Sequence, residues 1–242
     1  MPLAALLVAA TLALAAGCTT GKAAPPDLSL YPRILPETLF AFAWGGKASD
    51  PQAVEGVTVA FRPDGASRVF RLFACFPPER SCDTLEHFHD LDVGWRPMAG
   101  GVLGAFRLKH LASDYRVVVI AERPGEMATS PIVDVRPVSR PTRRVGNLLE
   151  FDVRQGEFLW HSAPDAALYV LTVDGGRTQP VAAGVATLRR SWLYPQLLGI
   201  VRHFHDPEAV RPLEPGEEYT VRLFGLDPDH WAEFVSEARL VP

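Results

Sequence analysis

Two copies of one tetrapeptide hold the residue types best suited to chemistry. His87-Phe88-His89-Asp90 recurs as His203-Phe204-His205-Asp206. On a β-strand, residues two apart share a face, so each copy could present two imidazoles to one ion. Imidazole suits zinc, copper or nickel, and a nearby carboxylate can ligate the ion or orient a ring. The sequence therefore raises a metal-binding hypothesis, with zinc or copper as the expected ion, whose ligands are His87, His89, His203, His205 and Asp206.

A second interpretation of these His pairs stays open. The first copy could be helical, which would separate its side chains, and the copies are out of register. His87 lies 28 residues before Tyr115 (115 − 87), whereas His203 lies 16 before Tyr219 (219 − 203). On this interpretation the imidazoles are exposed or hydrogen-bonded in loops.

The sequence gives no motif that points to catalysis. It has no Gly-x-Ser-x-Gly elbow, no Gly-rich phosphate loop and no His-Glu-x-x-His helix. A formal net charge of −4 gives no field that would favour nucleic acid. We therefore expect a non-catalytic protein that does not bind nucleic acid and needs no cofactor, zinc or copper excepted.

The elements that would position these residues are predicted to be strands. The 242 residues include 22 Pro and 19 Gly, spread between short apolar runs, and 48% of residues are hydrophobic. Dense turn residues between short apolar runs predict an all-β protein. The length allows one large domain or two small ones.

The stretch from Leu213 to Asp227 gives the clearest local prediction. Leu213, Pro215 and Gly216 form a turn, and Tyr219 then begins a run of period-two alternation. A Leu-x-Pro-Gly turn before a strand that starts with Tyr is typical of the tyrosine corner of β-sandwiches. There the phenol bonds to the upstream backbone.

The second half of the chain resembles a fibronectin type III domain. The resemblance rests on Trp160 in FLWHSAPDAALYVL, on Tyr169 in the next strand, and on LEPGEEY. It covers about 95 residues and implies structural roles for Trp160, Tyr169, Leu213, Pro215, Gly216 and Tyr219.

The first half resembles an immunoglobulin-like domain, without the features specific to fibronectin type III domains. Phe61 stands 99 residues before Trp160 (160 − 61), and Tyr115 stands 104 before Tyr219 (219 − 115). These offsets favour a tandem duplication. However, Phe61 replaces the Trp, and no Leu-x-Pro-Gly precedes Tyr115.

The N-terminus resembles a bacterial lipoprotein signal. An apolar run over residues 3–16, too short to cross a bilayer, ends in Ala15-Ala16-Gly17-Cys18. The resemblance implies cleavage before Cys18 and a lipid on its thiol, and Thr19 favours retention in the outer membrane. Ordinary secretion, with cleavage after Ala15 or Ala16, is the alternative.

If Cys18 carries a lipid, two cysteines remain, and an exported protein can join them in a disulfide. Cys75 and Cys82 flank FPPERS, so in an oxidising compartment we predict a loop-closing disulfide. The alternative is two buried thiols. Seven-residue spacing does not fit a two-Cys zinc knuckle.

These features together predict two tandem immunoglobulin-like (fibronectin type III-like) sandwiches after a lipoprotein signal and a short tether. The expected division is a signal at 1–17, lipidated Cys18 and tether at 18–33, an immunoglobulin-like sandwich at 34–136, a solvated, basic linker at 137–145, and a fibronectin type III-like sandwich at 146–242.

The expected function is binding or assembly at the bacterial cell envelope. The partner would be an envelope protein or surface polymer, bound through loops or a sheet edge, with the membrane contacted through the lipid on Cys18. The alternative is a periplasmic metal or small-ligand binder that uses the two HFHD copies. A glycan could instead stack on exposed Trp192 with Tyr194, or on Trp231.

Overall fold

The computed structural model describes most of the chain after the first 32 residues. The described residues are 33–46, 56–65, 67, 69–76, 82–109, 111–137, 139–146, 148–161, 166–196, 200–205 and 210–242. Among them, the helical elements are two 3₁₀ turns, η2 (Leu85–His87) and η3 (Ala99–Gly101), and all other elements are strands. The all-β prediction is confirmed.

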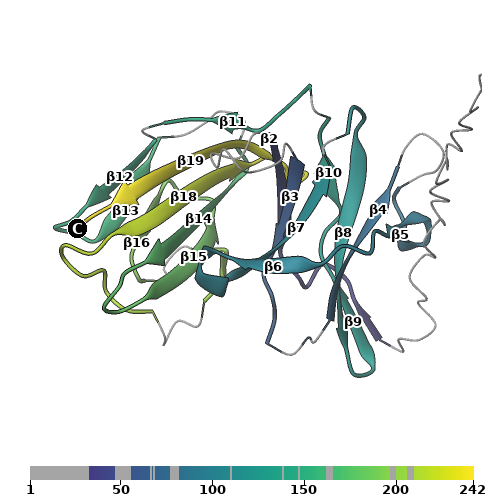
Figure 1. The fold of residues 1–242 in the computed structure, drawn as a ribbon, viewed down its shortest axis with the longest axis horizontal. Coiled ribbons are helices and arrows are strands. Elements are labelled where there is room, and N and C mark those ends of the chain that lie inside the picture. Colours follow the sequence, from purple (N-terminus) through teal and green to yellow (C-terminus); the bar gives the residue numbers. More distant parts are fainter. Residues whose placement is uncertain are drawn as a thin grey trace, which may run out of the picture.

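The strands form four sheets, numbered I to IV, which pack as two sandwiches (Figure 1). Sheet I orders its strands as β1 (Arg33–Leu35), β9 (Glu126–Thr129), β8 (Tyr115–Arg123), β4 (Val69–Cys75) and β5 (His89–Asp90), and β10 (Val133–Val135) pairs with β8. Sheet II is β2 (Ala41–Gly46), β3 (Gly56–Phe61), β7 (Leu103–Lys109) and β6 (Trp95–Met98). Sheet III is β11 (Arg143–Arg144), β19 (Ala232–Leu240), β18 (Tyr219–Leu226), β14 (Leu168–Gly175), β15 (Val181–Thr187) and β17 (Arg202–His203). Sheet IV is β12 (Leu149–Asp152), β13 (Glu157–Trp160) and β16 (Ser191–Leu193).

An apolar core lies between sheets I and II, and another lies between sheets III and IV. A third core joins the two sandwiches, where the outer face of sheet II packs on the outer face of sheet III. Strand β2 explains this arrangement because its two faces enter different cores. Ala41 and Ala43 belong to the first core, whereas Phe42 belongs to the joining core and contacts Phe224 at a ring separation of 5.1 Å.

The outer face of sheet I is covered by the chain itself. Val118 and Ile120 of β8 point away from the first core, because alternate strand residues face opposite sides of a sheet. They are buried in a small cluster with Cys82 and Phe88, which lie in the segment after β4. Sheet I is therefore apolar on both faces, which accounts for the β-branched run in β8.

The central strand pair has the same register in both sandwiches. Strand β4 pairs antiparallel with β8, placing Val69 opposite Glu122. Adding 99 to the first number and 104 to the second gives the pair Leu168 and Leu226, which lie opposite each other in β14 and β18. The two offsets read from the sequence thus describe one conserved pairing geometry.

The turn before β18 makes the hydrogen bond expected of a tyrosine corner. The backbone N–H of Glu214 donates to Tyr219 Oη at 3.0 Å, and Gly216 supplies the positive φ of +81° that the turn requires. At the equivalent position of the first sandwich, the Tyr115 hydroxyl is buried and has no hydrogen-bond partner among the described residues. Burial raises the pKa of Tyr115. The missing Leu-x-Pro-Gly turn thus corresponds to a missing hydrogen bond.

The segment expected to be a solvated linker is bound to both sandwiches. The Thr142 N–H donates to the Gly45 carbonyl at 2.8 Å, and the Gly45 N–H donates to Thr142 Oγ1 at 3.1 Å. Strand β11 then pairs parallel with β19. Arg140, Arg143 and Arg144 are exposed, as expected of a solvated linker, whereas the buried Thr142 and the short strand β11 attach the segment to its neighbours.

The β18–β19 loop fixes the second sandwich to the first. Trp231 is buried in the core between sheets I and II, and the Ala43 N–H donates to the carbonyl of His230 at 3.0 Å. Arg136 Nη2 lies 3.0 Å from Asp227 Oδ2 and 3.1 Å from Asp229 Oδ2. The two sandwiches therefore share apolar, backbone and ionic contacts.

Replacing Phe224 with Ala should destabilise the whole protein. Its ring is buried against Phe42 and Trp44, so the cavity left behind should lower the free energy of unfolding by about 3–5 kcal/mol. Denaturant titration followed by Trp fluorescence measures this loss. Phe76→Ala is the matched control because Phe76 is 43% exposed. Equal effects of the two variants would contradict the importance of the joining core.

The two equivalent tyrosines should respond differently to loss of the hydroxyl. Tyr219→Phe removes the acceptor for the Glu214 N–H and should cost about 1 kcal/mol. Tyr115→Phe removes a buried hydroxyl with no partner among the described residues, so stability should stay constant or rise. The same titration compares the two variants, and a larger loss for Tyr115→Phe would refute this explanation.

Candidate functional site

The first HFHD copy is divided between two elements. His87 ends η2 and His89 begins β5, which pairs with the edge of β4. Phe88 between them is fully buried on the outer face of sheet I, whereas both imidazoles are half-buried. The copy therefore anchors an edge strand through Phe88 and does not form the continuous strand that the metal hypothesis assumed.

The second copy places two imidazoles near each other. His203 lies in β17 and His205 follows it, with 6.0 Å between ring centroids. His203 Nδ1 lies 3.0 Å from the carbonyl oxygen of His205. His205 is buried, and its Nδ1 lies 3.0 Å from the N–H and 3.1 Å from the carbonyl oxygen of Gly184. Asp206 lies outside the described residues.

The structure does not bring the two copies together. Strand β5 is at the edge of sheet I in the first sandwich, and β17 is at the edge of sheet III in the second. Within the described ranges, no group of three or more His, Cys, Asp or Glu side chains is arranged to hold a metal ion. Metal binding therefore stays a prediction, and it concerns the second copy.

The aromatic residues considered for sugar stacking are buried. Trp192 donates its indole N–H to the carbonyl of Gln196 at 2.7 Å, and the Tyr194 hydroxyl donates to the carbonyl of Arg211 at 2.7 Å. Burial raises the pKa of Tyr194. Trp231 lies in the core of the first sandwich. The expectation of an exposed platform was wrong because these rings fill cores and satisfy their polar atoms internally.

Two other aromatic residues lie in the core, as the resemblance implied. Trp160 and Tyr169 pack in the second sandwich with ring centroids 5.7 Å apart.

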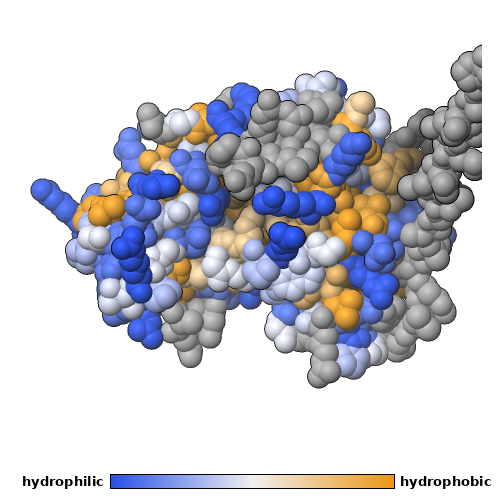
Figure 2. Space-filling view, viewed as in Figure 1, coloured by the Kyte–Doolittle hydropathy of each residue, from blue (hydrophilic) through white to orange (hydrophobic). Residues whose placement is uncertain are grey.

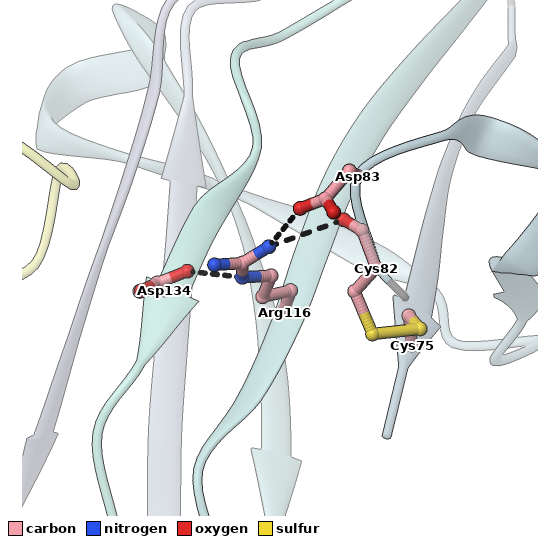
Figure 3. Close-up of a disulfide and its surroundings, with 5 residues drawn as sticks. All are labelled: Cys75, Cys82, Asp83, Arg116 and Asp134. Atoms are coloured by element: carbon pink, nitrogen blue, oxygen red, sulfur yellow. Dashed lines mark hydrogen bonds and ion pairs between the residues drawn. A yellow bond between two sulfur atoms is a disulfide. The ribbon is translucent and has the colours of Figure 1, made fainter. Parts of the chain in front are cut away.

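The predicted disulfide between Cys75 and Cys82 is present, with Cα atoms 5.7 Å apart (Figure 3). The disulfide lies next to a group of ion-paired side chains centred on Arg116. Arg116 Nη1 lies 2.8 Å from Asp83 Oδ1 and donates to the Cys82 carbonyl at 3.4 Å, while its Nε lies 2.9 Å from Asp134 Oδ1. Burial and the charge of Asp229 raise the pKa of Asp134, although Arg116 acts in the opposite direction. The disulfide thus fixes the segment that covers sheet I.

Loss of the disulfide should destabilise this cover. A Cys75→Ala, Cys82→Ala variant should lose about 2–3 kcal/mol of unfolding free energy, because its unfolded chain is less restricted. Denaturant titration measures the loss, and wild-type protein with reductant should match the variant. Alkylation of Cys75 and Cys82 in denaturant without reductant, located by peptide mass, would contradict the bond.

A pocket that sequence reasoning missed lies on the outer side of sheet IV. It is an open hollow of about 400 Å³, lined by Glu150, Leu159, Trp160, His161, Arg190 and Ser191. Three separate strands bring these residues together, since Leu159 lies opposite Glu150 on β12 and opposite Ser191 on β16. The residues are ordinary for a solvated strand face, so the sequence held no signal that distinguished them.

No protein-family model matches this chain, and a search of curated proteins finds no match either. The resemblances to lipoproteins and to fibronectin type III domains therefore remain expectations based on the residues quoted for them.

Helices of the described segments are too short to cross a membrane.

Proposed function

We propose that the protein is an envelope-anchored, non-catalytic binding or assembly module that presents the outer face of sheet IV to its partner. The proposal depends on which outer faces remain open. The segment after β4 covers sheet I, and sheets II and III cover each other. Among the described sheets, this leaves the outer face of sheet IV as the broad surface available to another molecule.

The chemistry of this face suits a partner of mixed polarity. Leu159 is 37% exposed and Leu193 is 36% exposed on neighbouring strands, beside Glu150 and Ser191. Figure 2 shows apolar and strongly hydrophilic side chains interspersed at the end of the molecule that carries β12 and β13. Strand β12 is also an edge strand, whose backbone can accept another strand.

The order of the sheets places this surface far from the first strand of the chain. Strand β1, the first in the chain, belongs to sheet I, and sheet IV lies at the opposite end of the stack (Figure 1). Stacked sheets lie about 10 Å apart, so three spacings separate the two ends by about 30 Å. A tether that begins at a lipidated Cys18, in the outer membrane as Thr19 suggests, would therefore join the described residues at sheet I, the end farthest from sheet IV.

A metal-binding function for the second HFHD copy is the other candidate. His203 Nδ1 lies 3.0 Å from the carbonyl oxygen of His205. Imidazoles that ligate a metal through one nitrogen commonly donate the other N–H in this way. Zinc or copper is the ion that such ligands suit.

Crosslinking in cells, followed by capture of the tagged full-length chain and mass spectrometry, tests the proposal. We expect one stoichiometric envelope partner, retained in the presence of a chelator. Leu159→Asp with Leu193→Asp should abolish capture because charge replaces the apolar part of the face. Val201→Asp is the matched control, since Val201 is exposed next to β17.

Two results would contradict the proposal. If the variant with both Leu substitutions captures the partner as wild type does, the outer face of sheet IV is not the surface that binds the partner. Capture that fails in chelator and in a His203→Ala variant would favour the metal-binding candidate. Membrane fractionation of a Cys18→Ala variant tests the anchor separately, and we expect this variant to leave the membrane fraction.

A further inference from the structure

The pocket on sheet IV has opposite charges at its two sides. Glu150, Leu159 and Ser191 form one row across the three strands, at adjacent positions of the ladder. Neighbouring strands lie about 4.8 Å apart, so the row spans about 10 Å from β12 to β16. His161 and Arg190 lie next to the row, where the Trp160 N–H donates to the Arg190 carbonyl. The pocket thus offers a carboxylate on one side, an apolar floor, and the Arg190 guanidinium with the Ser191 hydroxyl on the other.

The Glu150 and Arg190 charges and the His161 imidazole have no side-chain partner within the described part of the chain. Glu150, His161 and Arg190 make no side-chain hydrogen bond or ion pair there. Strand arginines elsewhere behave differently. Arg116 and Arg222 each contact two carboxylates. The charges around the pocket are therefore available to a ligand without the loss of an existing ion pair.

Trp160 also borders the pocket, with its side chain in the core between sheets III and IV. The Trp160 side chain is 4% exposed, and its indole Nε1 has no acceptor among the described residues. The other fully buried Trp of this sandwich, Trp192, donates its indole N–H to Gln196. The two indole N–H groups therefore distinguish the side of the sandwich next to the pocket, where Trp160 lies, from the rest of its core.

We propose that this pocket binds a short zwitterionic peptide. An ammonium group would contact Glu150, a carboxylate would contact Arg190 and Ser191, and an apolar side chain would pack on Leu159. Three extended residues span about 10 Å, which matches the row from Glu150 to Ser191. The inference rests on the proposed function, because it names the chemistry by which sheet IV recognises its partner.

Titration of the full-length chain with the tripeptide Ala-Leu-Ala, followed by ¹⁵N NMR of the indole groups, tests the pocket. We expect saturable binding that shifts the Trp160 indole resonance and leaves that of Trp192 in place. Acetylating the amino end or amidating the carboxyl end should each weaken binding about tenfold, because each removes one charged contact.

Surface variants separate the two ends of the ligand. Glu150→Gln should remove the preference for a free amino end, and Arg190→Met should remove the preference for a free carboxylate. Glu157→Gln and Arg154→Met are matched controls, since both residues lie outside the pocket in the same strand pair and its turn. Shifts that do not saturate, or equal effects of pocket and control variants, would overturn the proposal.

The partner capture described above separates this inference from the proposed function. If the tripeptide does not bind and a Glu150→Gln, Arg190→Met variant captures the envelope partner as well as wild type does, the pocket proposal fails and the binding function stands. If the tripeptide binds and no partner is captured, the pocket stands and the assembly function fails. Competition by the tripeptide against a captured partner would identify a peptide within that partner as the source, whereas tripeptide binding without competition would identify a free peptide.

Discussion

The apolar contact between sheets II and III is the constraint on which the rest of the structure depends. It requires β2 to be apolar on both faces, with Ala41 in one core and Phe42 in the next. It also places the β18–β19 loop where Trp231 can enter the first sandwich. Because the contact fixes two sandwiches that a free linker would leave mobile, the outer face of sheet IV has a defined orientation relative to sheet I.

Local patterns were sufficient to predict the all-β class, several of the strands and the disulfide. Alternation from Tyr219 onward and a turn at Gly216 are properties of adjacent residues, and they do not depend on distant partners. The partners that cover the two faces of β2 and the burial of Thr142 could not be predicted in this way. Each is explained by a contact with a segment far away in the chain, and a single sequence does not identify that contact.

The candidate site illustrates the same limit. The His pairs attracted attention because their residue type is rare and repeated, yet their separation is set by sheet edges that the sequence does not locate. Glu150, Leu159 and Ser191 have no unusual spacing. They become neighbours through the registers of β12 with β13 and of β13 with β16. Residue type suggested the metal-binding hypothesis, whereas the pocket on sheet IV could be found only from the strand pairing.

The two sandwiches also show how one pairing geometry can serve different surfaces. In each, the central strands have apolar residues on both faces, and the second face must be covered. Sheet I is covered by the disulfide-bonded segment through Phe88, and sheet III is covered by sheet II with Phe204 in the contact. Sheet IV has only three strands, and its outer face mixes half-exposed Leu with uncommitted charges. Such a face is stable in water and still offers apolar area to a partner, which is the combination that a reversible binding surface needs.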